Sequence, residues 1–234
     1  MKLLKLCATT AFATVFSAAQ AMTEDDPLIG KVIIDQLETR SADGSNPIVF
    51  EADGWLGYDL HKLWLKADVE KVGSDLEESE FQVLYSRAVD PYWDIQIGWR
   101  HNNKPKPSRN WLALGFQGLA PYWIETDAAL FIGENGQINA RVTLEHELMF
   151  TQRLVLIPEL TMNLFSKKDD AAEVGSGLSD MSFGLRLGYE IKREFAPYIG
   201  VNWTKKFGGT ADHARDAAER VSDTQWVTGV RAWF

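Results

Sequence analysis

Residues 225–234, which end the chain, read Gln-Trp-Val-Thr-Gly-Val-Arg-Ala-Trp-Phe. Counted back in steps of two from Phe234, one set of side chains contains no charge, while the other set contains Arg231. Successive side chains of a β-strand point to opposite faces, so the two sets would face opposite ways. The stretch therefore predicts a terminal strand with one uncharged face.

An aromatic residue that closes about ten alternating residues is typical of the last strand of a transmembrane β-barrel. The last strand of a soluble β-sandwich is the alternative interpretation. The same alternation recurs upstream, for example in Trp93–Arg100 and Met181–Ile191, where apolar residues occupy every second position. A mid-bilayer Arg or Lys costs about 2–4 kcal/mol, and from Ile48 onward almost no charge falls on the apolar faces. The pattern favours a barrel whose uncharged face meets lipid.

Twelve candidate strands follow one another, and ten is the alternative because Lys31–Arg40 and Phe81–Ala88 alternate poorly. Between them we expect a charged loop at Glu70–Glu80 and the longest loop at Gly208–Asp223. The later connections alternate between short turns and longer polar loops, with Gly133–Gln137 as an exception, which is the barrel pattern. The prediction is an all-β, closed antiparallel transmembrane β-barrel with both termini in the periplasm.

The first 21 residues have the features of a secretory signal peptide. Lys2 and Lys5 precede the apolar stretch Leu6–Ala19, and Ala19-Gln20-Ala21 is a small-residue cleavage site. We therefore expect a signal peptide at 1–21, a short flexible periplasmic lead at 22–30 and the barrel at 31–234. Because the leader holds two lysines and no acid, the exported part carries 22 basic and 33 acidic residues, a net charge of −11. This charge argues against a nucleic-acid partner and permits an interior that attracts cations.

The candidate site is a set of carboxylates on the face opposite the apolar one. Acidic residues in a pore concentrate cations and offer them oxygen ligands. A hydrated, salt-bridged filling of the barrel is the alternative interpretation of the same residues. The candidate metal-binding residues are Glu51, Asp53, Asp68, Glu125, Asp127, Glu145, Glu147 and Glu159.

A hairpin centred on Gly133–Gln137 would bring two acidic pairs of this set together. Pairing Gly133 with Gln137 sets Asp127 near Thr143 and Glu125 near Glu145. Opposed residues lie about 5 Å apart, so two ionised carboxylates there need a cation between them. Arg141 would make the cluster structural, whereas a divalent metal would make it functional.

Other chemistry finds little support in the sequence. The four histidines are isolated, and no serine has a histidine beside it, so we predict no catalytic residues and regard an outer-membrane hydrolase as the least favoured function. No cofactor-binding motif is present, because the Gly175-Ser176-Gly177 stretch lacks a following helix signal.

Several ordered motifs resemble one family. They are Leu63-Trp64-Leu65-Lys66, Leu84-Tyr85-Ser86-Arg87-Ala88, Gln117-Gly118-Leu119-Ala120-Pro121-Tyr122-Trp123, Thr151-Gln152-Arg153-Leu154, Gly175-Ser176-Gly177-Leu178-Ser179-Asp180 and Arg193-Glu194-Phe195-Ala196-Pro197-Tyr198-Ile199-Gly200-Val201. Over roughly Lys31–Phe234 the chain is similar to the copper resistance protein B family of outer-membrane proteins. The resemblance implies a barrel in copper homeostasis, embedded in outer-membrane lipid and often working beside a periplasmic multicopper oxidase.

The resemblance has one departure, since many members carry a Met- and His-rich segment before the barrel. Here Met22–Gly30 holds one methionine and no histidine. The first function we expect is binding or passing of copper ions through an acidic lumen, with copper as cargo. Oxygen ligands alone do not select copper. A narrow general porin, or a structural barrel without metal chemistry, is therefore the alternative.

Overall fold

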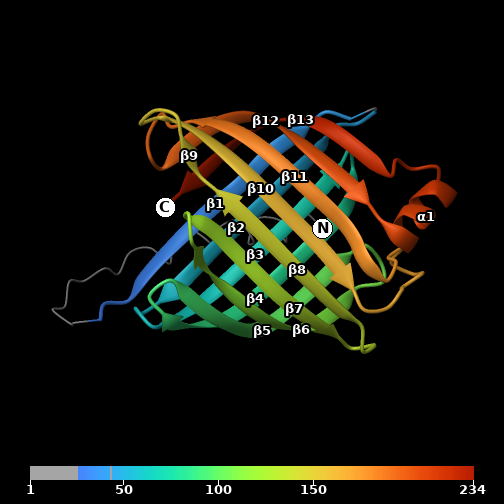
Figure 1. The fold of residues 1–234 in the computed structure, drawn as a ribbon, viewed down its shortest axis with the longest axis horizontal. Helices are drawn as coiled ribbons and strands as arrows, with labels where there is room; N and C mark the ends of the chain where they lie inside the picture. Colours follow the sequence, from blue (N-terminus) through green and yellow to red (C-terminus); the bar gives the residue numbers. More distant parts are fainter. Residues whose placement is uncertain (1–25, 43) are drawn as a thin grey trace, which may run out of the picture.

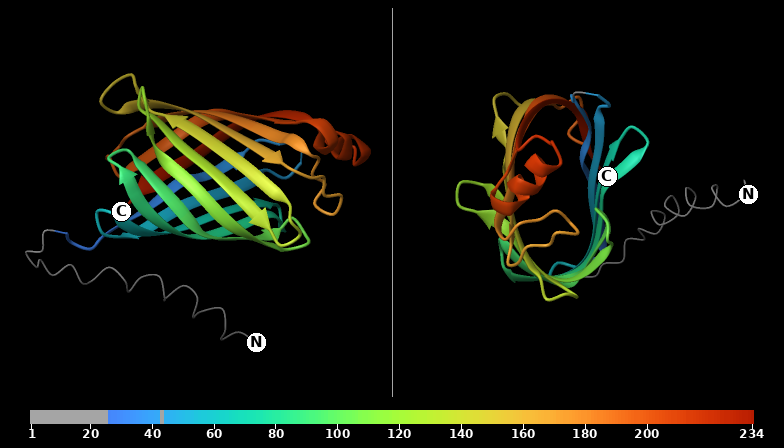
Figure 2. Two further views of the ribbon diagram at one scale, coloured as in Figure 1. Left: turned by 60° about the horizontal axis from the view of Figure 1, so that its bottom comes forward. Right: turned by 90° about the vertical axis from the view of Figure 1, so that its right-hand side faces the viewer.

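The computed structural model describes residues 26–42 and 44–234. The predicted leader at 1–21 and the start of the predicted lead lie outside the described residues. Antiparallel strands close into one barrel, oval in cross-section (Figures 1 and 2). Twelve long strands form its wall, as predicted, and one two-residue strand is added beside them.

The elements follow the predicted order with extended bounds. In the first half they are β1 (Ile29–Arg40), β2 (Pro47–Gly57), β3 (His61–Val72), β4 (Asp75–Asp90), β5 (Trp93–Lys104), β6 (Arg109–Ala120) and β7 (Ile124–Gly133). In the second half they are β8 (Ile138–His146), β9 (Leu148–Met149), β10 (Leu154–Phe165), β11 (Gly177–Tyr189), β12 (Phe195–Lys206), α1 (Gly208–Asp216) and β13 (Ser222–Trp233).

The terminal stretch closes the barrel by pairing β13 with β1. Ile33 lies opposite Trp233, the Val32 N–H donates to the Phe234 carbonyl at 3.0 Å, and the Phe234 N–H donates back at 2.8 Å. The uncharged set faces outward, with Trp226 73% and Phe234 68% exposed, while Arg231 points inward to its ion-pair partners. The prediction from this stretch is confirmed.

The two faces of the wall have opposite chemistry. Large apolar side chains such as Ile97, Leu114 and Ile199 stand exposed on the outside. More than half of the buried residues are polar or charged, and they include Gln36, Glu38, Lys66, Glu80, Gln82, Ser86, Gln96, Arg100, Asn102, Asn139, Arg186 and Asn202. This inverted distribution is what a hydrocarbon surrounding requires.

Two expectations about local structure were wrong, and one alternative is excluded. Glu70–Glu80 is no loop, because β3 and β4 continue through it and turn only at Gly73 and Ser74. Strand β1 contains Lys31–Arg40, and strand β4 contains Phe81–Ala88. The alternative of ten strands is therefore excluded. Gly208–Asp223 contains α1, and in the described residues no helix is long and apolar enough to cross a bilayer.

The barrel has two ends. The terminal end holds the start of β1, the end of β13 and the turns 58–60, 91–92 and 121–123, and the helix end holds α1. Figure 2 shows α1 and the loop 166–176 within the outline of the mouth at the helix end. Thr210 accepts a hydrogen bond from the Gly175 N–H at 2.8 Å, and its hydroxyl lies 3.0 Å from that of Ser179. A side chain at Gly175 would lie 2.6 Å from the Thr210 nitrogen, so only glycine allows this contact.

The closing strand pair depends on a close contact at Gly229. Gly229 lies opposite Glu38 on β1 and Tyr198 on β12. The Tyr198 hydroxyl crosses the glycine and donates to Glu38 Oε2 at 2.8 Å. A methyl group at Gly229 would lie 2.7 Å from the Tyr198 hydroxyl and 2.7 Å from the Leu37 carbonyl oxygen.

We expect Gly229→Ala to destabilise the barrel by about 1–3 kcal/mol, the usual cost of overpacking a filled site. The measurement is unfolding in guanidinium, followed by tryptophan fluorescence and by the heat-modifiable shift on gels. Thr228→Ala changes the neighbouring outward residue and serves as the control. Equal stability of the two variants would contradict the role of this contact.

Candidate functional site

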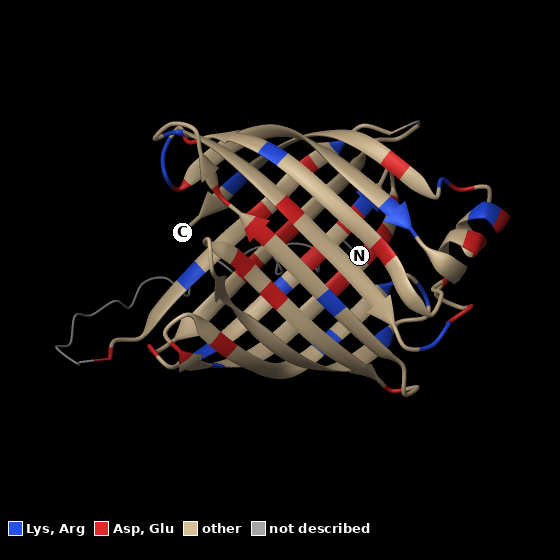
Figure 3. Cartoon of the chain, viewed as in Figure 1, with Lys and Arg blue, Asp and Glu red and all other residues tan. Residues whose placement is uncertain are grey.

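The lumen contains a cavity of about 560 Å³ on the side of the terminal end. Its wall includes Pro91 and Tyr92 of a terminal-end turn, and it reaches Arg141 and Arg186 in mid-barrel. Figure 3 shows acidic and basic residues at intervals along the strands in this region. The cavity is lined by seven of the eight predicted residues: Glu51, Asp53, Asp68, Glu125, Asp127, Glu145 and Glu159.

Five lining carboxylates form ion pairs with basic side chains from other strands, and Asp35 and Glu145 share Arg231 as their partner. Asp127 accepts from Lys66 Nζ at 2.5 Å, and Glu159 accepts from Arg186 Nη1 at 2.9 Å. Asp94 also lines the cavity and pairs with Lys62 at 3.2 Å. These acids therefore fit the alternative interpretation, in which carboxylates and basic side chains form a salt-bridged filling of the barrel.

Four other lining carboxylates have no such partner. Glu51, Asp53, Asp68 and Glu125 make no side-chain hydrogen bond or ion pair with any residue in 26–42 or 44–234. Glu51 lies directly opposite Asp68 on the neighbouring strand, and across the lumen it interacts electrostatically with Glu159. The cavity lining therefore holds more acidic side chains than basic ones, and four of its carboxyl groups have no basic partner among the described residues.

The predicted hairpin register is confirmed. Glu125 lies opposite Glu145, and Asp127 lies opposite Thr143. The predicted counter-ion was wrong, because the guanidinium beside Glu145 belongs to Arg231 of β13, at 2.9 Å, and not to Arg141. The turn that follows β8 carries Glu147 to the barrel mouth, where its side chain is 44% exposed and lies 3.2 Å from Arg231.

The carboxylates are not gathered into a finished coordination sphere. Within residues 26–42 and 44–234, no three His, Cys, Asp or Glu side chains are placed to hold one ion. The four carboxylates of the hairpin thus do not surround a common point. Met162 and Met181 lie opposite each other on β10 and β11.

Glu80, 1% exposed, is the centre of one ion-pair cluster beyond the cavity. Arg141 binds it with two nitrogens at 2.9 and 3.0 Å, and Arg100 lies 2.7 Å away. Asn102 and Gln82 donate further hydrogen bonds. Paired donors of this kind are the strongest way to hold a buried carboxylate.

Glu38, fully buried, is the centre of a second cluster on the other side of the lumen. Arg186 Nε donates to it at 3.0 Å, and Arg40 and Tyr198 each donate at 2.8 Å. Arg186 also binds Glu159 and the Gln36 side-chain oxygen. The same guanidinium therefore connects this cluster to the cavity wall.

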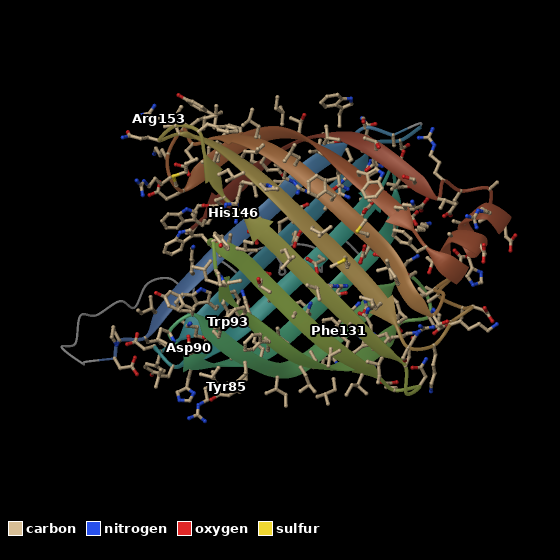
Figure 4. The ribbon with its side chains drawn as sticks, in the orientation of Figure 1. Tyr85, Asp90, Trp93, Phe131, His146 and Arg153 are labelled. Carbon is tan, nitrogen blue, oxygen red and sulfur yellow. The ribbon has the colours of Figure 1, made fainter. Side chains whose placement is uncertain are left out.

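An aromatic cluster adjoins the Glu80 cluster. The Arg100 guanidinium lies 4.2 Å from the ring centre of Phe131, and that of Arg141 lies 5.5 Å from it. Phe131, labelled in Figure 4, packs with Trp64, Leu84 and Trp111. Because the cavity wall includes Arg141 and Arg186 but not Glu80 or Glu38, the two clusters mark where the cavity ends.

A further ion pair fastens the loop 166–176 at the helix end. Asp169 contacts the Arg109 guanidinium and accepts backbone hydrogen bonds from Ala171 and Ala172. Burial raises the pKa of Asp169, but the hydrogen bond and the charge of Arg109 outweigh it and hold that pKa below its ordinary value. The pair thus stays charged at neutral pH.

Sequence reasoning missed three functional acids, Asp35, Glu38 and Glu80. A bulge in β1 between Ile34 and Leu37 shifts the phase of alternation, so Asp35 and Gln36 both reach the lumen. Glu80 lies in β4, within the stretch whose charge predicts a loop. The alternation Glu78, Glu80, Gln82, against Ser79, Phe81 and Val83, is a signal that would have found it.

Comparison with known proteins identifies the family. The family model described as copper resistance protein B precursor (CopB) matches residues 28–234. The chain belongs to the copper resistance protein B family. It is 39% identical to copper resistance protein B of Escherichia coli over 87% of this chain and 69% of that one. It is 37% identical to the homolog from Pseudomonas syringae pv. tomato over 95% and 76%.

Solved structures with the same fold are porins. The NanC porin matches with a TM-score of 0.56 and 12% identity, over 87% of this chain and 99% of that one. The KdgM porin in complex with disordered oligogalacturonate matches with a TM-score of 0.51 and 11% identity, over 88% and 99%. Together, family and fold support a role in copper resistance and a place in the outer membrane. Neither one points to an enzyme.

We expect Glu80→Gln to destabilise the barrel by about 3–5 kcal/mol, because it leaves two buried guanidinium groups without their counter-ion. The measurement is the free energy of unfolding in guanidinium for the protein in lipid vesicles. Glu77→Gln, an exposed acid on the same strand, should shift that energy by at most about 0.5 kcal/mol. A loss for Glu80→Gln no larger than this control would contradict the cluster's structural role.

Proposed function

We propose that this member of the copper resistance protein B family binds copper ions, as cargo, in the acidic cavity of its lumen. The observation that carries the proposal is the group of four cavity carboxylates without partners: Glu51, Asp53, Asp68 and Glu125. An unpaired carboxylate away from bulk water is costly. A bound cation removes that cost, and family membership makes copper the relevant ion.

Oxygen ligands are compatible with Cu(II). For a given set of oxygen and nitrogen ligands, affinity for divalent first-row metals rises through the series to a maximum at copper. The cavity side chains turn toward the ion when it enters, since no finished site precedes it. In this order zinc and manganese bind the same carboxylates more weakly than copper, although the oxygen ligands by themselves do not exclude those metals.

The two ion-pair clusters favour holding an ion over letting it pass freely. A cation that enters from the terminal end passes Glu147 and its partner Arg231 at the opening. It then reaches the cavity carboxylates, and beyond them the guanidinium groups of Arg141 and Arg186. Transfer to the helix end requires those clusters to separate. The multicopper oxidase that the family resemblance implies would exchange copper at the terminal end, where Tyr92 and Glu147 border the opening.

We expect purified protein equilibrated with Cu(II) to retain copper, and Glu51→Gln with Asp68→Asn to lower the retained amount several-fold. The physical reason is the loss of two of the four free charges. Inductively coupled plasma mass spectrometry after desalting gives the copper content. Glu125→Gln with Glu145→Gln tests the hairpin pair in the same way.

The matched control is Asp212→Asn with Asp216→Asn, which removes two exposed acids of α1 and should leave the copper content unchanged. All variants are first shown to be folded by heat-modifiability. A wild-type copper content no higher than that of an unrelated barrel would refute the proposal. An equal loss in the α1 variant would assign the effect to net charge instead of the cavity.

Closure of the lumen gives a separate expectation. In planar bilayers the wild-type barrel should conduct weakly, and changing Glu80, Arg100 and Arg141 together to Ser should raise the conductance several-fold by removing charge and bulk. Thr143→Ser, on the same wall, is the control. A wild-type conductance like that of an open porin would favour a narrow general porin. A triple variant with the same conductance as the wild type would show that the Glu80 cluster does not close the lumen.

A further inference from the structure

Three polar residues form a group on the outer face of the barrel near the terminal end. His61 begins β3, and Arg87 lies directly opposite it on β4. Tyr85 lies two residues before Arg87 on the same face of β4, opposite Leu63. All three side chains are exposed, and Figure 4 shows Tyr85 at the outer edge of the barrel.

The group is ordered by one internal hydrogen bond. His61 Nδ1 lies 2.5 Å from the Tyr85 hydroxyl, and the two rings stack with centres 5.9 Å apart. When the hydroxyl donates to Nδ1, the Nε2–H of His61 is a free donor. Arg87 makes no ion pair or side-chain hydrogen bond with the part of the chain that the structure describes. The group therefore offers donors and has no acidic partner.

The surroundings place this group at the border of the lipid-facing surface. The outward neighbours Leu63, Ile95 and Ile97 are apolar and about half exposed. Beyond Arg87, the chain turns at Pro91 after only three residues. A guanidinium beside hydrocarbon costs about 2–4 kcal/mol at mid-bilayer but little at the interface, where headgroups solvate it.

We propose that Arg87, His61 and Tyr85 bind the phosphodiester of a phospholipid in the leaflet at the terminal end. The fork of Arg87 matches two phosphate oxygens, and His61 adds a third donor. The apolar row Leu63, Ile95 and Ile97 receives the acyl chain of the same molecule. This combination of donors above an apolar face fits a lipid and not a free phosphate ion.

The test is native mass spectrometry of the full-length barrel in neutral detergent with phosphatidylglycerol as the added lipid. Arg87→Gln should reduce the affinity for this lipid about tenfold, as expected for the loss of a charge-assisted hydrogen bond. Tyr85→Phe, which frees the His61 ring, should give a smaller loss. The control is Arg153→Gln, which removes an arginine from a turn at the same end (Figure 4).

Two further arms identify the ligand chemistry. Diacylglycerol with the same acyl chains should bind at least tenfold more weakly than phosphatidylglycerol, and 10 mM inorganic phosphate should not displace the bound lipid. The proposal is overturned if Arg87→Gln and Arg153→Gln bind alike, if diacylglycerol binds as well, or if inorganic phosphate displaces the lipid. Copper content is independent of this group, so the copper proposal stands or fails separately.

Discussion

A backbone surrounded by hydrocarbon has to satisfy every one of its N–H and C=O groups within the chain, because no water can do so. In this protein the pairing of β13 with β1 meets that requirement by closing the sheet. Closure also encloses the side chains of the inner face. The contact of Glu38, Gly229 and Tyr198 across three strands shows how closely the seam and the lumen depend on each other.

Because the outer face is reserved for apolar side chains, nearly all strand charges enter one confined space. There they divide into two classes. Glu38 and Glu80 receive several donors each and lie at the centres of the clusters that end the cavity. Glu51, Asp53, Asp68 and Glu125 receive none among the described residues. Full pairing would give an inert filling, whereas the surplus of acid gives a cavity suited to cations.

Much of the fold is readable from the sequence because a β-strand alternates with a period of two. That rule located the outward faces, predicted twelve strands and set Glu125 opposite Glu145. The rule failed where a bulge interrupts the period of two. It also failed where nearly every residue of a strand is polar, because the two faces then look alike in the sequence. The bulge in β1 obscured Asp35 and Glu38, and the acidic run before Phe81 resembled a loop. The partners of Glu80 lie 61 residues away in Arg141 and on β5 in Arg100, so no local pattern could assign them.

We propose that copper occupies the lumen on the terminal-end side of Arg141 and Arg186. Anomalous diffraction at the copper absorption edge, from crystals of the full barrel soaked in Cu(II), tests it most directly. We predict an anomalous peak inside the cavity, within coordination distance of at least one of Glu51, Asp53, Asp68 and Glu125. Copper peaks confined to the outer surface or to the loops of the helix end, with none in the cavity, would contradict it.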